Sequence, residues 1–505
     1  MYVINLIKGI KNNSSNIIYP PGPAEIIPYR LALKFISNPL PILLQITKRY
    51  GDISHFKFGP KLHVYLINNA SYIENILVRD NNSFVKSPGL RLAKRVLGNG
   101  LITSEGKIHD IQRRLVQQAF TRNRVKTYGK IISEYSFEYI NNNWNDELIL
   151  DIHKEMTKLT LAIISKILFG SNTLALSDID NISNSITIII EYINKLRLPF
   201  LKFIEILPLP LTIKYKRALS DLDNLIYDKI HEKRQKTKKS LNENEINLDF
   251  SENTKSFQNK DDMDMLSILI ASGHNKETNN KENSIYENKS KVVRMDNRQL
   301  RDEVMTMFLA GHETTANALT WTIYLLALHP EKESKIVDEI ISLTGSNEDD
   351  NKLITFDDVS KLKYTEMVLM ESMRLYPPSW AIGRQAIEDY NLDNKYVIPS
   401  GSVLIMSQYL VHHDSRYFSQ PQKFYPERWT PEFRASIPRF SYFPFGGGSR
   451  SCIGEPLAWI EAIIILATII KRWKISLEED KKYVELRPLV TLRPKYGIRV
   501  KLCKR

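Results

Sequence analysis

The amino-acid sequence predicts a mainly helical α+β protein with a small β portion. Three long stretches carry apolar residues at helical spacing, from Leu148 to Ile230, from Asp296 to Pro330 and from Leu457 to Ile470. Alternating residues at His55 to Phe58 and His63 to Ile67 predict short strands, so a small sheet should lie near the front of the chain. Because the helical stretches are much longer than the strand-like ones, helices should supply most of the core.

The composition is that of an ordinary globular protein, and we expect a single domain over residues 1–505. Of the 505 residues, 43% are hydrophobic and 25% are charged, so a sizeable core can be buried. No clear linker divides the chain. Residues 1–19 form an N-terminal extension. Residues 233–262 and 274–292 are rich in Lys, Asn, Glu and Ser, which predicts two disordered insertions rather than further domains.

The charge and the cysteines limit the partners and the compartment. A net charge of +13 favours an acidic redox protein or an anionic membrane surface as partner. The Lys and Arg residues are dispersed and no nucleic-acid-binding motif accompanies them, which argues against nucleic acid. The two cysteines exclude a disulfide framework and favour the cytoplasm. No stretch reaches the roughly 20 apolar residues of a membrane span. Met1 to Lys11 is expected to form a frayed or docked terminal helix, with a helix that lies on a membrane surface as the alternative.

A glycine-dense loop from Phe443 to Gly454 contains Cys452 and leads directly into an apolar helix. Glycines let the backbone approach a flat ligand and turn its N–H groups inward to form an anion-binding nest. Gly454 and Pro456 suit a helix start, so the positive end of the helix dipole should point at the sulfur. These surroundings should lower the pKa of the thiol and favour the thiolate that binds metals. A plain turn with a small buried cysteine is the alternative.

The loop resembles the haem-thiolate signature of the cytochrome P-450 superfamily, Phe-x-x-Gly-x-Arg-x-Cys-x-Gly. Its fixed positions are filled by Phe445, Gly448, Arg450, Cys452 and Gly454. The resemblance implies the cytochrome P-450 fold, with haem b bound non-covalently between a long central helix and this loop. It also implies that Cys452 is the axial ligand of the haem iron and that Phe445 and Arg450 bind the cofactor, Arg450 at a propionate.

The central helix should begin at Asp296, with Gln299 as capping-box partner, and end at Pro330. Its middle, residues 310–315, reads Ala-Gly-His-Glu-Thr-Thr, which places polar groups inside an otherwise apolar helix. A glycine there lets another group approach the backbone, and a threonine hydroxyl can compete for a helix carbonyl. An acid and a hydroxyl can relay protons in a dry pocket. A chance polar interruption of a core helix is the alternative.

This segment is similar to the oxygen-activation motif of the cytochromes P-450. The resemblance makes Thr314 and Glu313 catalytic and places Ala310 and Gly311 beside the haem. Two further motifs belong to the same pattern, Glu-x-x-Arg at residues 371–374 on a helix and Pro-Glu-Arg-Trp at residues 426–429. Glu371 and Arg374, three residues apart, can pair, and the family implies that Arg428 joins them in a buried structural network.

The segment Gly106 to Arg114 places His109 and Arg113 on one helix face. Members of the family commonly have Trp and Arg at these positions, and both reach a haem propionate. Here His109 replaces the Trp and could still donate a hydrogen bond. By the same resemblance Arg384 is a further propionate partner. A basic surface turn remains the alternative for the Gly106 to Arg114 segment.

Three other expectations concern segments around this site. By resemblance Ala381 and Ile382 line the pocket. Residues 412–414, His-His-Asp, read as a turn rather than a metal site. In this family the stretch from Leu148 to Ile230 carries the lid over the substrate pocket. By resemblance Phe200, Phe203 and Ile206 would face the substrate, with ordinary core packing as the alternative.

The sequence is therefore identified as a member of the cytochrome P-450 superfamily. The implied activity is that of a monooxygenase that inserts one oxygen atom of O₂ into a lipophilic organic substrate, by C–H hydroxylation or epoxidation. An isomerase or peroxygenase relative, a non-catalytic haem-binding sensor and a nucleophilic cysteine enzyme are the alternatives. Because no electron-transfer module is fused, a separate ferredoxin or flavodoxin with its reductase should dock on a basic face around Arg113, Arg114 and Lys471. The protein is expected to be a monomer.

Overall fold

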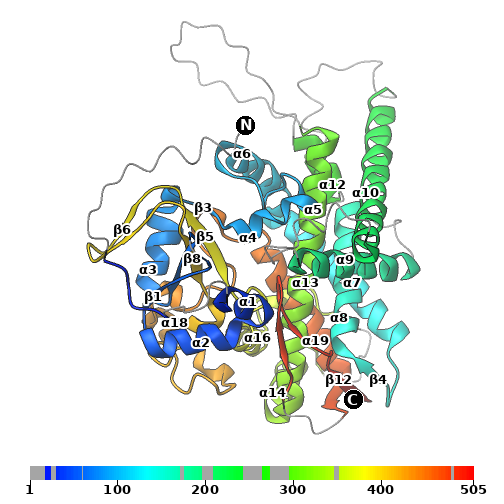
Figure 1. Cartoon of the computed structure of the whole chain (residues 1–505). Helices are drawn as coiled ribbons and strands as arrows, with labels where there is room; N and C mark the ends of the chain where they lie inside the picture. The colour runs from blue at the N-terminus through cyan, green and yellow to red at the C-terminus, as the bar shows by residue number, and fades with distance from the viewer. Residues whose placement is uncertain are drawn as a thin grey trace, which may run out of the picture.

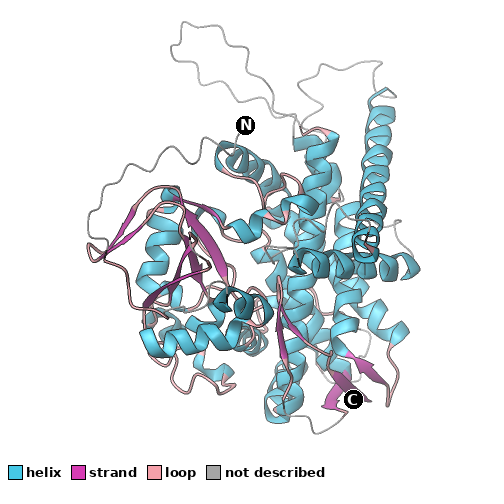
Figure 2. Ribbon diagram, in the orientation of Figure 1, coloured by secondary structure: helices cyan, strands magenta, loops and turns pink. Residues whose placement is uncertain are grey.

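The computed structural model describes residues 18–23, 30–59, 61–170, 176–195, 209–242, 264–272, 295–345, 352–478 and 483–505. The expected N-terminal helix over Met1 to Lys11, the lid residues Phe200, Phe203 and Ile206, and most of both insertions lie outside these ranges. Helices form one large part of the molecule, and the main sheet lies beside them with the N-terminal helices (Figure 2). The expected mainly helical α+β architecture is therefore confirmed.

Five long helices form the helical core: α7 (Arg122–Asn143), α8 (Ile152–Phe169), α13 (Asn297–Leu328), α16 (Lys363–Leu375) and α19 (Glu455–Arg472). Around them lie α6 (Gly106–Gln117), α9 (Leu176–Lys195), α10 (Pro210–Asn242), α12 (Met265–Ser272) and α14 (Pro330–Thr344). The shorter helices are α1 (Arg30–Ser37), α2 (Pro39–Tyr50), α3 (Ala70–Glu74), α4 (Pro88–Arg91), α5 (Lys94–Leu97), α15 (Phe356–Val359), α17 (Gln408–His412) and α18 (Pro431–Ser436). Figure 1 shows α13 running through the middle of the helical part.

The main sheet joins strands from residues 53–86 to strands from residues 382–406. Its five strands lie in the order β1 (Ile53–Lys57), β2 (His63–Ile67), β8 (Val403–Met406), β5 (Ile382–Ala386) and β3 (Phe84–Lys86). The β2–β8 pair is parallel and the other pairs are antiparallel. Smaller sheets are formed by β4 (Ile149–Asp151), β12 (Arg499–Lys504) and β9 (Trp473–Leu477), by β6 (Tyr390–Leu392) and β7 (Tyr396–Ile398), and by β10 (Leu486–Pro488) and β11 (Leu492–Pro494).

The central helix α13 begins and ends where the sequence predicts. The Asp296 carboxylate accepts a hydrogen bond from the Gln299 amide (2.7 Å), which caps the first turn. The Gln299 side chain donates to Glu303 instead of closing the capping box. Pro330 begins the next helix, α14, because proline cannot continue α13 but suits a first turn.

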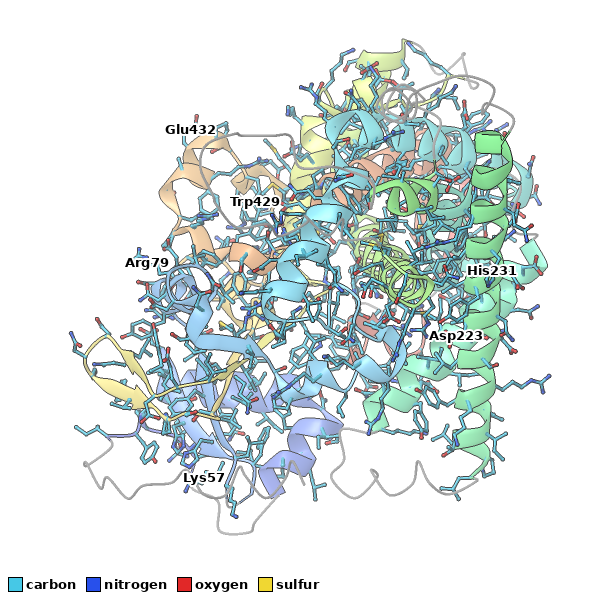
Figure 3. The ribbon with its side chains drawn as sticks, turned by 90° about the horizontal axis from the view of Figure 1, so that it is seen from above. Lys57, Arg79, Asp223, His231, Trp429 and Glu432 are labelled. Carbon is cyan, nitrogen blue, oxygen red and sulfur yellow. The ribbon has the colours of Figure 1, made fainter. Side chains whose placement is uncertain are left out.

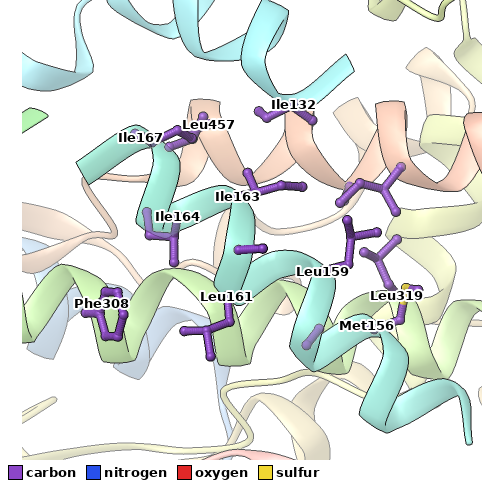
Figure 4. Packing of buried hydrophobic residues seen from close by; sticks show 14 of the residues in the cluster. Ile132, Met156, Leu159, Leu161, Ile163, Ile164, Ile167, Phe308, Leu319 and Leu457 are labelled. Carbon is purple, nitrogen blue, oxygen red and sulfur yellow. The ribbon is translucent and has the colours of Figure 1, made fainter. Parts of the chain in front are cut away.

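The core is formed where α8 packs against α13. Figure 4 shows α8 between α13 and α19, with Leu159 and Ile163 buried among aliphatic side chains such as Leu319. At Gly311 an added Cβ would lie 3.1 Å from the Ile164 side chain, so glycine is the residue that lets the two helices approach this closely. The group that approaches the Gly311 backbone is therefore an α8 side chain.

One expected boundary is corrected. Helix α10 continues to Asn242, so the first ten residues of the insertion expected over 233–262 are helical. Lys is frequent there and is accompanied by Arg234 and Gln235, and these residue types are good helix formers even when no apolar face marks the segment. Among the helices in the described ranges, none combines the length and the hydropathy that crossing a bilayer requires.

Candidate haem-thiolate site

The loop Phe443–Gly454, here called the cysteine loop, is held by its own backbone. The Phe443 carbonyl accepts from the Gly446 amide (3.0 Å), and the Phe445 carbonyl accepts from the Cys452 amide (3.0 Å). Gly446 has a φ of 75° and Gly448 has a φ of 70°, which glycine adopts without strain. An added Cβ at Gly448 would also overlap the Leu77 carbonyl oxygen. The loop therefore requires glycine at both positions.

The Cys452 side chain is accessible to solvent, although it lies among many protein atoms. Burial raises the pKa of its thiol, and the N–H groups of Gly454 and Glu455 at the start of α19 only partly oppose this. The expectation that the loop by itself lowers the pKa of the thiol is therefore wrong, because desolvation outweighs the dipole of the helix. A bound metal cation would supply the missing positive charge, since a coordinating thiol is deprotonated outright.

Helix α13 has one accessible face in its middle. Between Leu300 and Leu326 every residue is buried except Leu309, Ala310, Gly311 and Thr314. Ala310 and Thr314 are one helical turn apart, and the Thr314 hydroxyl donates to the Ala310 carbonyl (2.8 Å). The next residue, Thr315, donates to the Gly311 carbonyl (3.2 Å). The hydroxyls of Thr314 and Thr315 therefore both donate to backbone carbonyls one helical turn earlier.

Glu313 points to a different neighbour from Thr314. Its Oε1 atom accepts hydrogen bonds from Arg493 Nε (2.7 Å) and from the Thr491 hydroxyl, and Arg493 Nη2 lies 2.6 Å from the same oxygen. Asn317 donates to the Glu313 carbonyl (2.8 Å). The β10–β11 hairpin is therefore tied to α13 beside the accessible face, an arrangement that no sequence motif indicated.

Cationic side chains converge where the sheet meets the cysteine loop. Arg384 on β5 lies opposite Lys86 on β3, and both are buried. Burial lowers the pKa of Arg384 to about 10, and the positive charge of Arg450 adds to this. Burial likewise lowers the pKa of Lys86 to about 8. The Arg384 Nε atom is buried, and it has no hydrogen-bond partner in the part of the chain that the structure describes.

The Arg450 side chain forms its hydrogen bonds with neighbouring protein groups. It donates to the Phe84 carbonyl (3.1 Å) and to Glu105 (3.1 Å). The Lys86 ammonium bonds the carbonyls of Leu101 (2.9 Å) and Ser104 (2.6 Å). The cluster therefore holds three cations close to Glu105, and an added anion would be attracted there.

Two predicted residues lie on α6. Arg113 donates to the Ser451 carbonyl (2.9 Å), so it contacts the cysteine loop next to Cys452. His109 is buried, and this burial lowers the pKa of its imidazole; the charge of Lys86 adds to the effect. Its Nδ1 atom lies 3.5 Å from Asp110. The structure brings Arg113 to the loop and leaves His109 as a neutral ring within the core.

Glu371, Arg374 and Arg428 lie together beneath the loop. Both Glu371 oxygens bond Arg374 (2.8 and 2.9 Å), and Arg428 Nε donates to Glu371 Oε1 (3.1 Å). The Trp429 indole donates to Glu371 Oε2 (2.9 Å). Glu371 and Arg374 are 0% exposed, so the charges can persist only because they are paired. Figure 3 shows Trp429 far from the long helix α10, on which Asp223 and His231 are labelled.

The outer side of the cysteine loop forms a surface groove of about 510 Å³. Residues Gly446–Gly448 line it together with Arg434, Arg439 and Trp459. The basic face expected around Arg113, Arg114 and Lys471 is corrected, because Lys471 is buried and its ammonium donates to the Lys352 carbonyl (3.0 Å). An apolar helix can bury such a stem and still direct its charged end to a carbonyl.

The residues present fit a haem. An accessible cysteine, an accessible stripe on α13 and a buried Arg384 Nε without a partner are what the iron, the flat ring and a propionate respectively require. Ile382 also lies over the loop, since an added Cβ at Gly446 would be 3.3 Å from its Cδ1 atom. Phe445 stays at the start of the loop, with its ring 5.7 Å from that of Trp459.

Comparison with known proteins gives the same family. The cytochrome P-450 family model matches residues 20–502. Cyclooctatin synthase of Streptomyces melanosporofaciens is 32% identical over 88% of this chain and 87% of its own length. Cyclooctat-9-en-7-ol 5-monooxygenase of the same organism is 29% identical over 90% of this chain and 88% of its own length. Pentalenene oxygenase of Streptomyces avermitilis is 25% identical, over 93% of each chain.

The fold has solved counterparts. A retinoic-acid-bound cyanobacterial CYP120A1 superimposes with a TM-score of 0.78 at 23% identity, covering 97% of this chain and all of the other. The chain belongs to the cytochrome P-450 family and is a haem-thiolate monooxygenase. Enzymes of this class use O₂ and electrons from a redox partner.

Several residues that contact the site were missed from the sequence. Lys86, Glu105 and Arg493 belong to no motif, and their contacts join segments far apart in the chain. From the sequence, His412 is predicted only to lie in a turn. It is the last residue of α17, and its Nε2 atom accepts from the Phe443 amide (3.0 Å).

Proposed function

We propose that the chain oxidises a lipophilic hydrocarbon-like substrate at a haem b held by the Cys452 thiolate, with Thr314 and Glu313 supplying protons. The observation that carries this proposal is the accessible face of α13, on which Thr314 is the one hydroxyl-bearing residue between Leu300 and Leu326 that is not buried. When bound, haem supplies oxygen binding and activation, assisted by electron donation from a thiolate ligand.

Each site residue has a proposed task. Cys452 provides the axial ligand, and the rigid cysteine loop keeps its sulfur in place. Arg384 pairs with a propionate through its unpartnered Nε atom, and Arg113 holds the loop beside the ligand. Arg450 and His109 contribute to the electrostatic field and the packing around that propionate, since neither is directed at an open site in this arrangement.

The proton route involves Thr314 and Glu313. The Thr314 hydroxyl gives its hydrogen to the Ala310 carbonyl, so its oxygen is free to accept a hydrogen bond from the accessible side. The hydrogen bonds described for the Glu313 carboxylate all end on Oε1, which leaves Oε2 for proton exchange. On α13 the residues beside Thr314 on this side, Leu309 and Ala310, are apolar. By the family resemblance Ala381 and Ile382 would extend this apolar lining, which would limit water.

The substrate class is supported by the lining and by the relatives. The names of two relatives specify an unsaturated alcohol and a hydrocarbon, cyclooctat-9-en-7-ol and pentalenene. An apolar lining around one hydroxyl suits such a molecule, because little polar surface would lose its hydrogen bonds on binding. The monomeric state and the location in the cytoplasm stay predictions.

The electron donor is proposed to dock on the groove outside the cysteine loop. Arg434 and Arg439 are exposed there, and Ser451, the residue before Cys452, also lines the groove, which would give a short path to the iron ligand. An acidic ferredoxin or flavodoxin would be attracted by these charges. Arg439→Glu should slow reduction by such a donor severalfold at low salt, and the difference should shrink as salt is raised. Arg217→Glu, on the surface of α10, is the matched control that should change neither.

The first experiment is the absorption spectrum of the dithionite-reduced, carbon-monoxide-bound protein. A strongly red-shifted Soret band is expected, and Cys452→Ala should abolish it. Thr314→Ala should keep the band but reduce product formed per O₂ consumed, while Thr315→Ala, whose hydroxyl does not line the accessible face, should change that ratio less. An imidazole-like band in folded wild-type protein would contradict the proposal.

A further inference from the structure

His412 joins two parts of the site that the sequence treats as separate. Its backbone carbonyl accepts a hydrogen bond from Arg374 Nη1 (2.9 Å), within the ion-pair network of α16. Its Nε2 atom accepts from the backbone amide of Phe443 (3.0 Å), the first residue of the cysteine loop. The side chain is 0% exposed, so water cannot replace either contact.

The imidazole is an acceptor towards the loop. A ring nitrogen that accepts an N–H hydrogen bond carries no proton, so the neutral ring has its hydrogen on Nδ1. Burial keeps the pKa of His412 well below its usual value, and the neighbouring His413 and Arg374 act in the same direction. The ring also packs against Tyr442 and Phe443, at centroid distances of 5.0 and 5.5 Å. Its orientation is therefore fixed by packing as well as by hydrogen bonding.

Two short steps lead from Phe443 to the ligand. The Phe443 carbonyl accepts from Gly446, and the Phe445 carbonyl accepts from the amide of Cys452 itself. If the Phe443 amide lost its acceptor, a buried N–H would be left unpaired, which is a costly arrangement. The loop would then relax at Phe443, the end at which the hydrogen bonds that lead to Cys452 begin.

We infer that His412 is a positioning residue for the thiolate ligand: it holds the cysteine loop to the Glu371–Arg374 core through the Phe443 amide. This inference rests on the proposed role of Cys452 as iron ligand. A histidine that merely fills the core would be replaceable by another ring of similar size, whereas a positioning acceptor would not.

The test compares three substitutions in the haem-loaded protein. His412→Phe keeps a ring of similar size but removes the acceptor. His412→Gln keeps an acceptor at a similar distance from the backbone. His413→Phe is the matched control, because His413 follows α17 directly and its Nδ1 atom bonds the Tyr409 carbonyl of that helix (2.7 Å) instead of the loop.

Two readouts are measured: hydrogen–deuterium exchange of peptides covering residues 440–452, and the rate at which the carbon-monoxide-bound thiolate spectrum is lost on incubation. His412→Phe should raise exchange at the Phe443 amide by about tenfold or more and should lose the thiolate spectrum severalfold faster. His412→Gln and His413→Phe should stay close to wild type in both.

The outcomes separate the two proposals. If the wild-type protein lacks the thiolate spectrum, the role of Cys452 fails. If the wild type has that spectrum but His412→Phe matches it in both readouts, or His413→Phe is equally affected, the role of His412 is overturned. Should His412→Phe not fold, the wild-type measurement still decides, because a Phe443 amide that exchanges as fast as a free loop amide contradicts the inference.

Discussion

Two buried glutamates each bind arginine, and they do so in different ways. Glu371 on α16 uses both carboxylate oxygens, bonding Arg374, Arg428 and the Trp429 indole. Glu313 on α13 receives Arg493 and Thr491 on the single oxygen Oε1. Both side chains are buried among segments that are far apart in the sequence.

The difference shows how one residue type serves two purposes. A carboxylate whose lone pairs are all occupied by fixed donors has no capacity left for chemistry, and its removal leaves buried cations unpaired. A carboxylate with one oxygen uncommitted stays anchored and can still exchange a proton. We therefore assign Glu371 to the stability of the loop support and Glu313 to the reaction.

The largest effect is expected for Glu371→Gln. The substitution leaves Arg374 and Arg428 buried without a counter-charge, and we expect the free energy of unfolding to fall by about 3–5 kcal/mol. Chemical denaturation followed by circular dichroism, together with haem content, measures this. Glu366→Gln on the same helix is the control, since its partner Arg434 is exposed and the pair should contribute less than about 1 kcal/mol. Equal losses in the two variants would contradict the comparison.

A third buried glutamate extends the comparison, because no cation among the described residues pairs with Glu461 on α19. Burial raises the pKa of its carboxyl to about 8, and the Thr315 hydroxyl 3.5 Å away opposes this only weakly. The folded state then holds a proton that the unfolded chain releases above about pH 4.5, so wild-type stability should fall as the pH rises from about 4.5 towards 8.

Glu461→Gln removes this titration. Its stability relative to wild type should increase over that pH window by up to a few kcal/mol and level off above about pH 8. Urea unfolding of both proteins at three pH values tests this. A pH-independent difference would mean that Glu461 finds a partner when it ionises.

A smaller effect on stability than that of Glu371→Gln is expected for Glu313→Gln. The amide oxygen can still accept from Arg493 and Thr491, so the free energy of unfolding should fall by about 1–2 kcal/mol, less than for Glu371→Gln. Product formed per O₂ consumed should nevertheless drop, with haem content unchanged. Arg493→Lys, which keeps the positive charge, should retain more of that ratio. A loss of stability as large as that of Glu371→Gln would make Glu313 a structural residue too.

Local features of the site were predictable from the sequence. The Asp296 cap, the end of α13 before Pro330 and the glycine turns around Cys452 depend on residues only a few positions apart. At such short range the backbone geometry allows few arrangements, so spacing alone identifies the contact. The Glu371–Arg374 pair on one helix is of the same kind.

Other features were decided only by the tertiary structure. The pairing of Arg450 with Glu105, of Glu313 with Arg493 and of His412 with Phe443 joins segments whose distance in sequence carries no information about their distance in space. The raised pKa of the Cys452 thiol likewise comes from the atoms packed around it, which a local motif does not specify. The sequence by itself determined which groups carry the chemistry, while packing determined their partners, because hydrogen bonds and desolvation act only between groups that the fold brings together.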